Sequence, residues 1–173
     1  NNFGFLNKKK NLKIGIPDSK IHSRYKKDLN DGLFSIFAKK KNINIKVITL
    51  DDFNKKKKLD KIDFIKIDVE GAEALVLKGA KKTIKKFSPI IQLEFNELTK
   101  ILGNKEISYF REFAEKFNYK IYYLVENYKL KQKINIKKDF FSDLILINKQ
   151  KKWMNLSNII GSGFIAKSFK KKN

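Results

Sequence analysis

The sequence predicts an α/β domain in which an open sheet carries helices on both sides. Three short, nearly continuous apolar runs, at residues 62–68, 89–95 and 142–148, are typical of strands that are covered on both faces. Residues 72–87, between the first two runs, place apolar side chains at helical spacing. A second helical pattern at residues 105–117 precedes a β-branched and aromatic run at 119–125.

Residues 1–41 form a leading segment with a weak pattern. Turn signals occur at Pro17-Asp18 and at Asn30-Asp31-Gly32, and the short apolar runs 12–16 and 33–37 are candidate edge strands. From residue 43 the pattern sharpens, because apolar residues alternate with polar ones over 43–49, as expected of a strand. The chain then turns, and Asp51 or Asp52 is a candidate helix cap.

A strand–helix–strand unit is expected over residues 62–95. Such a crossover connects parallel neighbours, so the strands at 62–68 and 89–95 should run in the same direction. The last predicted strand is 144–147, and a basic tail follows it. We therefore divide the chain into a leading segment (1–41), a main α/β part (42–148) and a tail (149–173).

Composition excludes several classes of site. The 173 residues, or 20.3 kDa, suit one domain. The chain has no cysteine, which excludes disulfides, thiolate zinc sites and a cysteine nucleophile, and its single histidine, His22, cannot form a histidine metal cluster. No run approaches the ~18 apolar residues of a membrane span, and no signal peptide is evident. We expect a soluble cytoplasmic protein.

The formal charge is +22, from 40 basic and 18 acidic residues, which is typical of proteins that bind polyanions. Only Arg24 and Arg111 are arginine, although arginine is the usual residue of phosphate and guanine recognition. Lysine is spread along the chain and accompanies abundant Asn, Ile and Phe, the set that A/T-rich codons encode. We therefore expect no specific nucleic-acid partner, and a basic polyanion-binding module remains the minor alternative.

Candidate chemistry gathers at the ends of two predicted strands. Alternation places Lys66, Asp68 and Glu70 on one side of the first strand, and Glu94 ends the next parallel strand. Ligands of open α/β sheets bind beyond the carboxyl ends of the strands, where these side chains should meet. The alternative is an internal Lys66–Asp68 ion pair, with Glu70 or Glu73 serving the following helix.

The sequence motifs of this region resemble those of one enzyme family. Lys66-Ile-Asp-Val-Glu-Gly-Ala-Glu73, Leu77-Lys-Gly-Ala80 and Pro89-Ile-Ile-Gln-Leu-Glu94 follow Val47-Ile-Thr-Leu-Asp-Asp-Phe53 in the order and spacing of the FkbM family of S-adenosylmethionine-dependent methyltransferases. The resemblance is firm over residues 47–95 and fainter through 147.

The resemblance implies a Rossmann-like class I methyltransferase sheet, mostly parallel with a reversed last strand. It also implies S-adenosylmethionine as cofactor and a hydroxyl of a sugar or secondary metabolite as acceptor. Carried over, Asp68 and Glu70 fall at the end of the fourth strand, where such enzymes face the methyl group and the acceptor, and Glu94 falls at the end of the fifth strand. Our hypothesis from the chemistry is that Asp68 is the base or orients the hydroxyl, and that Lys66 or Glu70 tunes it. Nothing in the sequence specifies a metal.

One part of the family pattern is missing. No Asp-x-Gly-x-x-x-Gly-like cofactor loop precedes the motif, since Gly4, Gly15 and Gly32 are unsuitably spaced, and the chain begins with Asn1 rather than methionine. We therefore expect the C-terminal part of a larger methyltransferase, apparently without the first strands of the sheet. The alternative is a truncated, non-catalytic relic.

Overall fold

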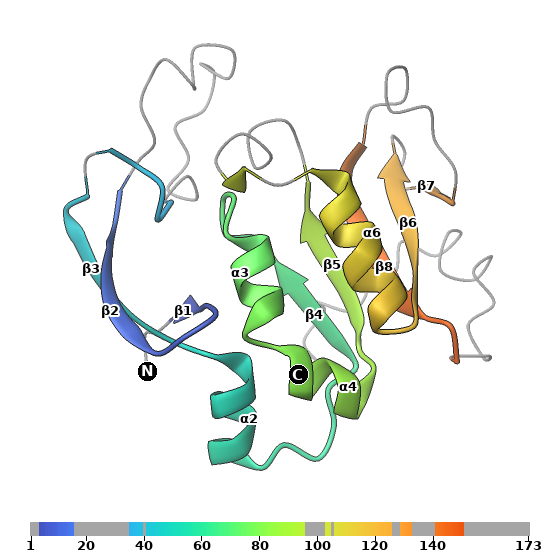
Figure 1. The fold of residues 1–173 in the computed structure, drawn as a ribbon, viewed down its shortest axis with the longest axis horizontal. Helices are drawn as coiled ribbons and strands as arrows, with labels where there is room; N and C mark the ends of the chain where they lie inside the picture. Colours follow the sequence, from blue (N-terminus) through green and yellow to red (C-terminus); the bar gives the residue numbers. More distant parts are fainter. Residues whose placement is uncertain are drawn as a thin grey trace, which may run out of the picture.

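The computed structural model describes residues 4–15, 35–39, 41–95, 103–104, 106–125, 129–132 and 141–150, which form a mixed α/β structure with two mixed sheets (Figure 1). The strands are β1 (Gly4–Phe5), β2 (Lys10–Ile14), β3 (Ile43–Ile48), β4 (Phe64–Ile67), β5 (Ile90–Glu94), β6 (Tyr119–Val125), β7 (Lys129–Lys131) and β8 (Phe141–Asn148). The helices are α2 (Leu50–Lys57), α3 (Glu73–Lys78), α4 (Lys81–Phe87) and α6 (Ile107–Lys116). The predicted tail lies outside the described residues from 151 onward.

The five-stranded sheet has the order β4-β5-β8-β6-β7. β4 and β5 are parallel, with Phe64 opposite Ile90, which confirms the predicted crossover. β8 is antiparallel to both β5 and β6, so the predicted reversal of the last strand is also confirmed. β4, β5 and β6 therefore run in the same direction, whereas β8, between β5 and β6, and β7, beside β6, run the opposite way, so the sheet is mixed.

The three-stranded sheet has the order β1-β3-β2. β1 is parallel to β3, while β2 is antiparallel to it, from Lys10 opposite Val47 to Ile14 opposite Ile43. The candidate edge strand at 12–16 thus corresponds to β2. In the described part of 33–37, Ser35 forms only an isolated bridge with Gly15. Strands of the leading segment therefore pair directly with the strand that opens the main α/β part.

One face of the larger sheet is packed against helices α3 and α6 (Figure 1). The main core joins apolar residues of that face to helix residues; its fully buried members include Ile91, Leu93, Leu144, Leu146, Leu77, Ile84 and Phe110. On the opposite face, Ile90, Leu124, Ile145 and Ile147 form a second cluster that contains no described helix. For the part of the chain that the structure describes, the expectation of helices on both sides is therefore wrong.

The predicted core strands differ in how deeply their residues are buried. Each of the four residues Ile90–Leu93 of β5 is buried, as predicted for a strand covered on both faces. β4 differs, since Phe64 and Lys66 are exposed while Ile67 is buried. In the described sheet β4 is the end strand, and helices pack only on the face that carries Ile67.

The predicted helix over 72–87 is two short helices, α3 and α4, separated at Gly79-Ala80. Thr49, rather than Asp51 or Asp52, caps α2, because its Oγ1 accepts a hydrogen bond from the Asp52 N–H at 2.9 Å. Asp51 instead caps α4, and its two carboxylate oxygens accept from Lys82 N–H (3.1 Å) and Thr83 N–H (2.7 Å). This link holds α2 beside α4.

None of the described helices has the length and apolar character needed to cross a membrane.

Candidate functional site

A tight turn follows β4 and carries two of the predicted site residues. Glu70 has φ of 48° and Gly71 has φ of 95°, so both lie in the left-handed region. The buried Glu73 side chain stabilises this turn, because its Oε1 accepts hydrogen bonds from the N–H groups of Val69 (3.3 Å) and Gly71 (3.2 Å). The turn thus presents Asp68 and Glu70 beyond the end of the strand.

Ser35 and Gly103 contact the same turn from distant parts of the chain. The buried Ser35 Oγ donates a hydrogen bond to the carbonyl oxygen of Glu70 at 2.8 Å. A Cβ at Gly103 would lie 2.3 Å from the carbonyl oxygen of Gly71, so only glycine permits this approach. The turn is therefore held from several sides.

The structure brings together the three predicted carboxylates. One carboxylate oxygen from each of Asp68, Glu70 and Glu94 lies within 4.8 Å of the others. Parallel pairing of β4 and β5 explains this arrangement, because Ile67 lies opposite Leu93 and the carboxyl ends of the two strands are therefore adjacent. We call these three residues the carboxylate cluster.

Lys66 lies beside the carboxylate cluster. Its Nζ is 2.9 Å from Asp68 Oδ2, with side chains that are 51% and 46% exposed respectively, so this ion pair is open to solvent rather than internal. The hydrogen bond from Lys66 to Asp68 raises the pKa of the lysine, and the charges of Asp143 and Glu94 add to this rise. Partial burial of the lysine acts in the opposite direction and lowers its pKa. A Lys66–Asp68 ion pair is thus present beside the predicted cluster, but it is exposed and not the internal pair of the alternative interpretation.

Burial and mutual repulsion favour the protonated form of the other carboxyl groups. Burial is the main cause that raises the pKa of Glu94 to about 8, and the charges of Glu70, Asp68, Asp143 and Glu73 add to it. Burial followed by the charge of Asp68 also raises the pKa of Glu70. Burial raises the pKa of Glu73 to about 7, although the hydrogen bonds that it accepts from backbone N–H groups oppose the shift.

Gln92 and Asp143, which the sequence pattern did not single out, adjoin the cluster. β8 is antiparallel to β5, so Asp143 near its beginning lies opposite Glu94 at the end of β5. Gln92 Nε2 donates a hydrogen bond to Asp143 Oδ2. The sequence signal, an aspartate at the start of an apolar strand, becomes meaningful only once the order and direction of the strands are known.

This arrangement suits two kinds of chemistry. Several carboxylates close together attract a cation or a cationic group of a ligand. A carboxyl group with a raised pKa can also accept a proton from a reacting hydroxyl near neutral pH.

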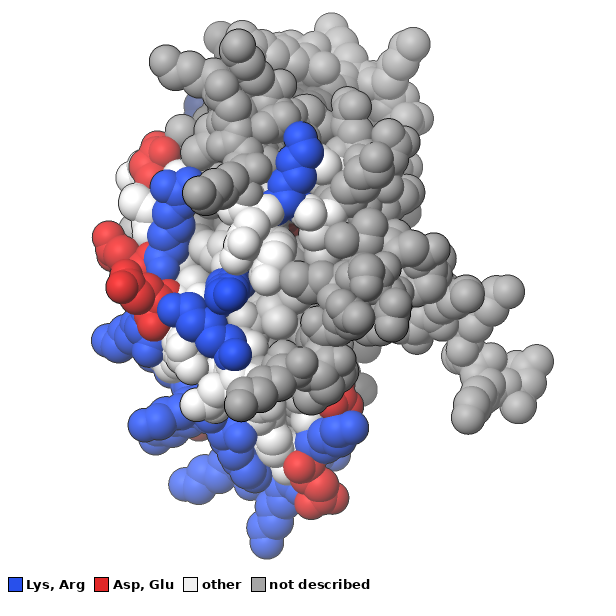
Figure 2. All heavy atoms as spheres, turned by 90° about the vertical axis from the view of Figure 1, so that its right-hand side faces the viewer, with Lys and Arg blue, Asp and Glu red and all other residues white. Residues whose placement is uncertain are grey.

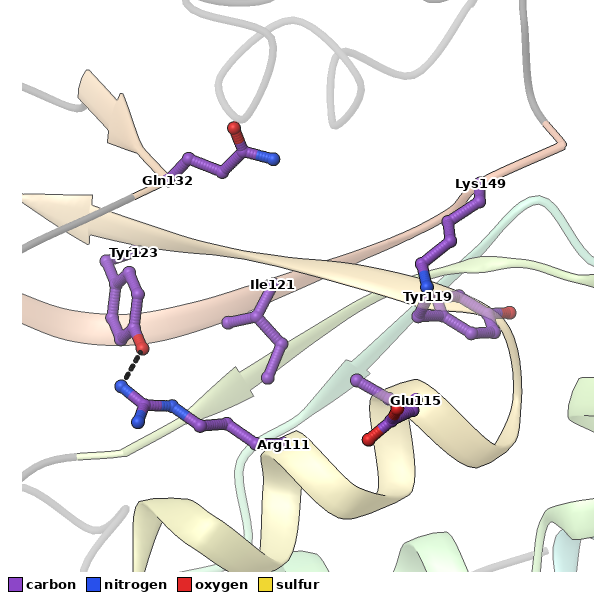
Figure 3. A pocket seen from close by; sticks show the side chains of 8 residues that line it. Arg111, Glu115, Tyr119, Ile121, Tyr123, Gln132 and Lys149 are labelled. Atoms are coloured by element: carbon purple, nitrogen blue, oxygen red, sulfur yellow. Dashed lines mark hydrogen bonds between the residues drawn. The ribbon is translucent and has the colours of Figure 1, made fainter.

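A separate pocket of about 350 Å³ lies between α6 and β6 (Figure 3). Arg111 and Glu115 extend from α6, and Ile121 and Tyr123 come from β6. None of the predicted site residues lines it, so the carboxylate cluster and this pocket are distinct features.

Comparison with known protein families gives a match. The sequence model of the methyltransferase FkbM domain matches residues 9–121, which is more than half of the chain and includes the whole carboxylate cluster. No curated protein and no solved structure matches the chain.

Proposed function

This chain belongs to the FkbM methyltransferase family, and we propose that its carboxylate cluster serves methyl transfer to a hydroxyl of a sugar or secondary metabolite, as part of a larger enzyme. Methyltransferases of this family use S-adenosylmethionine. The observation that carries the proposal is the convergence of Asp68, Glu70 and Glu94 at the carboxyl ends of two parallel strands. Ligand sites of α/β sheets lie at such ends.

The strand order supports a Rossmann-like class I arrangement for the complete enzyme. β4, β5, β8 and β6 are consecutive neighbours, and β8 is the reversed strand between β5 and β6. The family resemblance implies a reversed strand of this kind. On this proposal, the first strands of the full sheet would extend it beyond β4.

The cluster fits the reacting end of the cofactor better than the rest of it. S-adenosylmethionine, when bound, supplies an electrophilic methyl group on a positively charged sulfur. A carboxylate such as Asp68 attracts that charge. The described residues contain no glycine-rich loop of the Asp-x-Gly-x-x-x-Gly type, and we assign none of them to the adenosyl part.

Each residue of the site has a separate task in the proposal. Asp68, held by Lys66 at 2.9 Å, accepts a hydrogen bond from the acceptor hydroxyl and orients its oxygen toward the methyl group. Glu94 would take the proton that the hydroxyl loses when its oxygen bonds to the methyl carbon and the carbon–sulfur bond breaks, since its pKa of about 8 makes it a stronger base than an ordinary carboxylate. Glu70 helps to keep that pKa high through its charge.

Replacement of Asp68 and Glu94 in the enzyme that contains this chain tests these roles. We expect Asp68→Asn and Glu94→Gln each to lower kcat by roughly 10²-fold or more, with circular dichroism unchanged. Transfer of a labelled methyl group to sugar hydroxyls is the measurement. Asp63→Asn is the matched control, because Asp63 pairs with Lys61 on the exposed side of the chain before β4.

Normal turnover by Asp68→Asn and Glu94→Gln would contradict the assignment of these residues. Failure of the unmodified enzyme to bind S-adenosylmethionine would instead favour the non-catalytic relic.

A further inference from the structure

The pocket between α6 and β6 is an open depression that combines apolar, aromatic and charged side chains. Its volume of about 350 Å³ lies within the usual range for ligand pockets. Ala114, Tyr119, Ile121 and Tyr123 contribute an apolar floor, while the rim is polar and consists of Arg111, Glu115, Gln132 and Lys149. Tyr119 and Tyr123 are buried, so the floor belongs to the folded core.

Arg111 is an unusual residue in this chain. Of 40 basic residues only two are arginine, and Arg111 is the one within the described part. Its Nη2 donates a hydrogen bond at 2.9 Å to the Tyr123 hydroxyl, so a buried phenol orients the guanidinium (Figure 3). Arginine differs from lysine in its planar fork, which can donate two parallel hydrogen bonds to a single anion.

The remaining rim groups define what could bind. Lys149 adds a second cation at the opposite end of the floor from Arg111 (Figure 3). Glu115 lies one turn after Arg111 on α6, and the described residues provide no ion pair between them. The Tyr119 hydroxyl is already bonded to the Pro89 carbonyl at 2.8 Å, so Tyr119 contributes its ring rather than a polar group.

We propose that this pocket binds a small organic anion, a carboxylate or phosphate monoester on an apolar body. The anion accepts parallel hydrogen bonds from the Arg111 fork, with Lys149 contributing charge. The apolar body packs on Ile121 and the Tyr119 ring, and Glu115 accepts from any hydroxyl or amine of the ligand. This site is independent of methyl transfer, since it shares no residue with the carboxylate cluster.

Nuclear magnetic resonance of the full chain tests the proposal directly. A chain with only two arginines gives two Nε–H signals, of which one belongs to Arg111. We expect benzoate and phenyl phosphate to shift the Arg111 signal at about 0.15 M salt, where non-specific attraction is screened. Benzyl alcohol, which has the same ring and no charge, should produce no saturable shift.

Variants separate the fork from simple charge. Arg111→Lys preserves the charge and should lower the affinity for both anions at least about tenfold, since the paired hydrogen bonds are lost. Tyr123→Phe should lower the affinity less, because it removes the hydrogen bond that orients the guanidinium but leaves the guanidinium in place. Lys116→Gln, on the same helix but outside the pocket, is the control for net charge and should bind normally.

Four results would overturn the proposal. Equal binding by Arg111→Lys would show that the fork is not used, and equal binding of benzyl alcohol would show that no anion is recognised. Shifts confined to the Arg24 signal would place binding elsewhere. If inorganic phosphate binds as tightly as phenyl phosphate, the apolar floor plays no part and the site for an organic anion is also rejected.

Discussion

The buried carboxyl group of Glu73 organises the turn that carries Asp68 and Glu70. Its Oε1 accepts two backbone N–H groups, of Val69 and Gly71, at a place where the backbone takes two left-handed conformations in succession. Removing the acceptor would leave these two donors unsatisfied, and at least the one on Gly71 is buried. Glu73 therefore acts on the site through the shape of the turn.

Glu73→Ala should lower the free energy of unfolding by about 1–3 kcal/mol, because buried N–H groups lose their partner. Glu73→Gln retains an acceptor oxygen and should cost less. Urea unfolding measures both, and Glu112→Ala on the exposed face of α6 is the control. An equal loss for Gln and Ala would show that the carboxyl acceptor does not hold the turn.

The raised pKa values of Glu94 and Glu73 make stability depend on pH. In the folded chain these groups bind protons up to about pH 8 and about pH 7, whereas in the unfolded chain they release them near the ordinary glutamate pKa of 4.5. The folded state thus binds more protons between these limits, so stability falls as pH rises through the window.

We expect Tm to decrease between about pH 5 and pH 8, and Glu94→Gln to flatten that decrease, since the amide stays neutral. Thermal unfolding over this range is the measurement. Asp60→Asn is the control, because Asp60 is exposed and does not belong to the carboxylate cluster, and this variant should keep the wild-type profile. A Tm that rises across the window in the unmodified chain would contradict the raised pKa values.

Among the elements, the junction between α3 and α4 joins the helical layer to the smaller sheet. A Cβ at Gly79 would lie 2.0 Å from the carbonyl oxygen of Leu6. Because the contacted atoms belong to the backbone, rotation of a side chain could not relieve this contact. The carbonyl of Gly79 also accepts a hydrogen bond from the Asp51 N–H at 3.0 Å. The helical pattern over 72–87 therefore breaks where the chain must pass close to Leu6.

Gly79→Ala should destabilise the fold by about 1–3 kcal/mol or more, because overpacking against backbone cannot be relieved by side-chain rotation. Gly4→Ala is a suitable control, since its Cβ would meet Val47 Cγ1 at an ordinary 3.4 Å. Chemical denaturation compares the two. Similar stability of both variants would mean that the approach of Leu6 to Gly79 does not constrain the fold.

The same elements show how far local pattern predicts structure. Residues 119–125 form β6 with the predicted bounds, and the strands at 62–68 and 89–95 are shorter by only a few residues. Alternation and helical spacing are local properties, so they identify elements well. The cap of α2 was mistaken because Asp51 serves a different helix, α4, which only the tertiary contact reveals.

At the scale of the whole molecule, the charge of +22 produces a non-specific electrostatic attraction for polyanions and does not form a specific binding site. Figure 2 shows basic side chains spread over one face and gathered toward its lower end, with acidic groups among them. α2 and α4, which contact one another, carry many exposed lysines at the lower end in Figure 1. Lysines distributed in this way attract polyanions without selecting a sequence.

Duplex DNA should therefore bind only at low ionic strength, with an affinity that falls by roughly 10³-fold or more between about 50 and 200 mM salt. Fluorescence anisotropy with two unrelated duplexes of equal length is the measurement, and both should give the same salt dependence. Retained, sequence-selective affinity at physiological salt would reverse this expectation and favour the polyanion-binding alternative.

The sequence by itself determined the family and most of the elements, and it predicted that Lys66, Asp68, Glu70 and Glu94 lie close together, because local periodicity and a contiguous motif encode these features. Tertiary structure alone decided that β8 brings Asp143 beside Glu94, that Glu73 holds the turn, and that Arg111 and Tyr123 shape a pocket. These features depend on the order and direction in which distant strands pair. Such long-range contacts leave no periodic trace in a single chain, so they emerge only when the packed core fixes them.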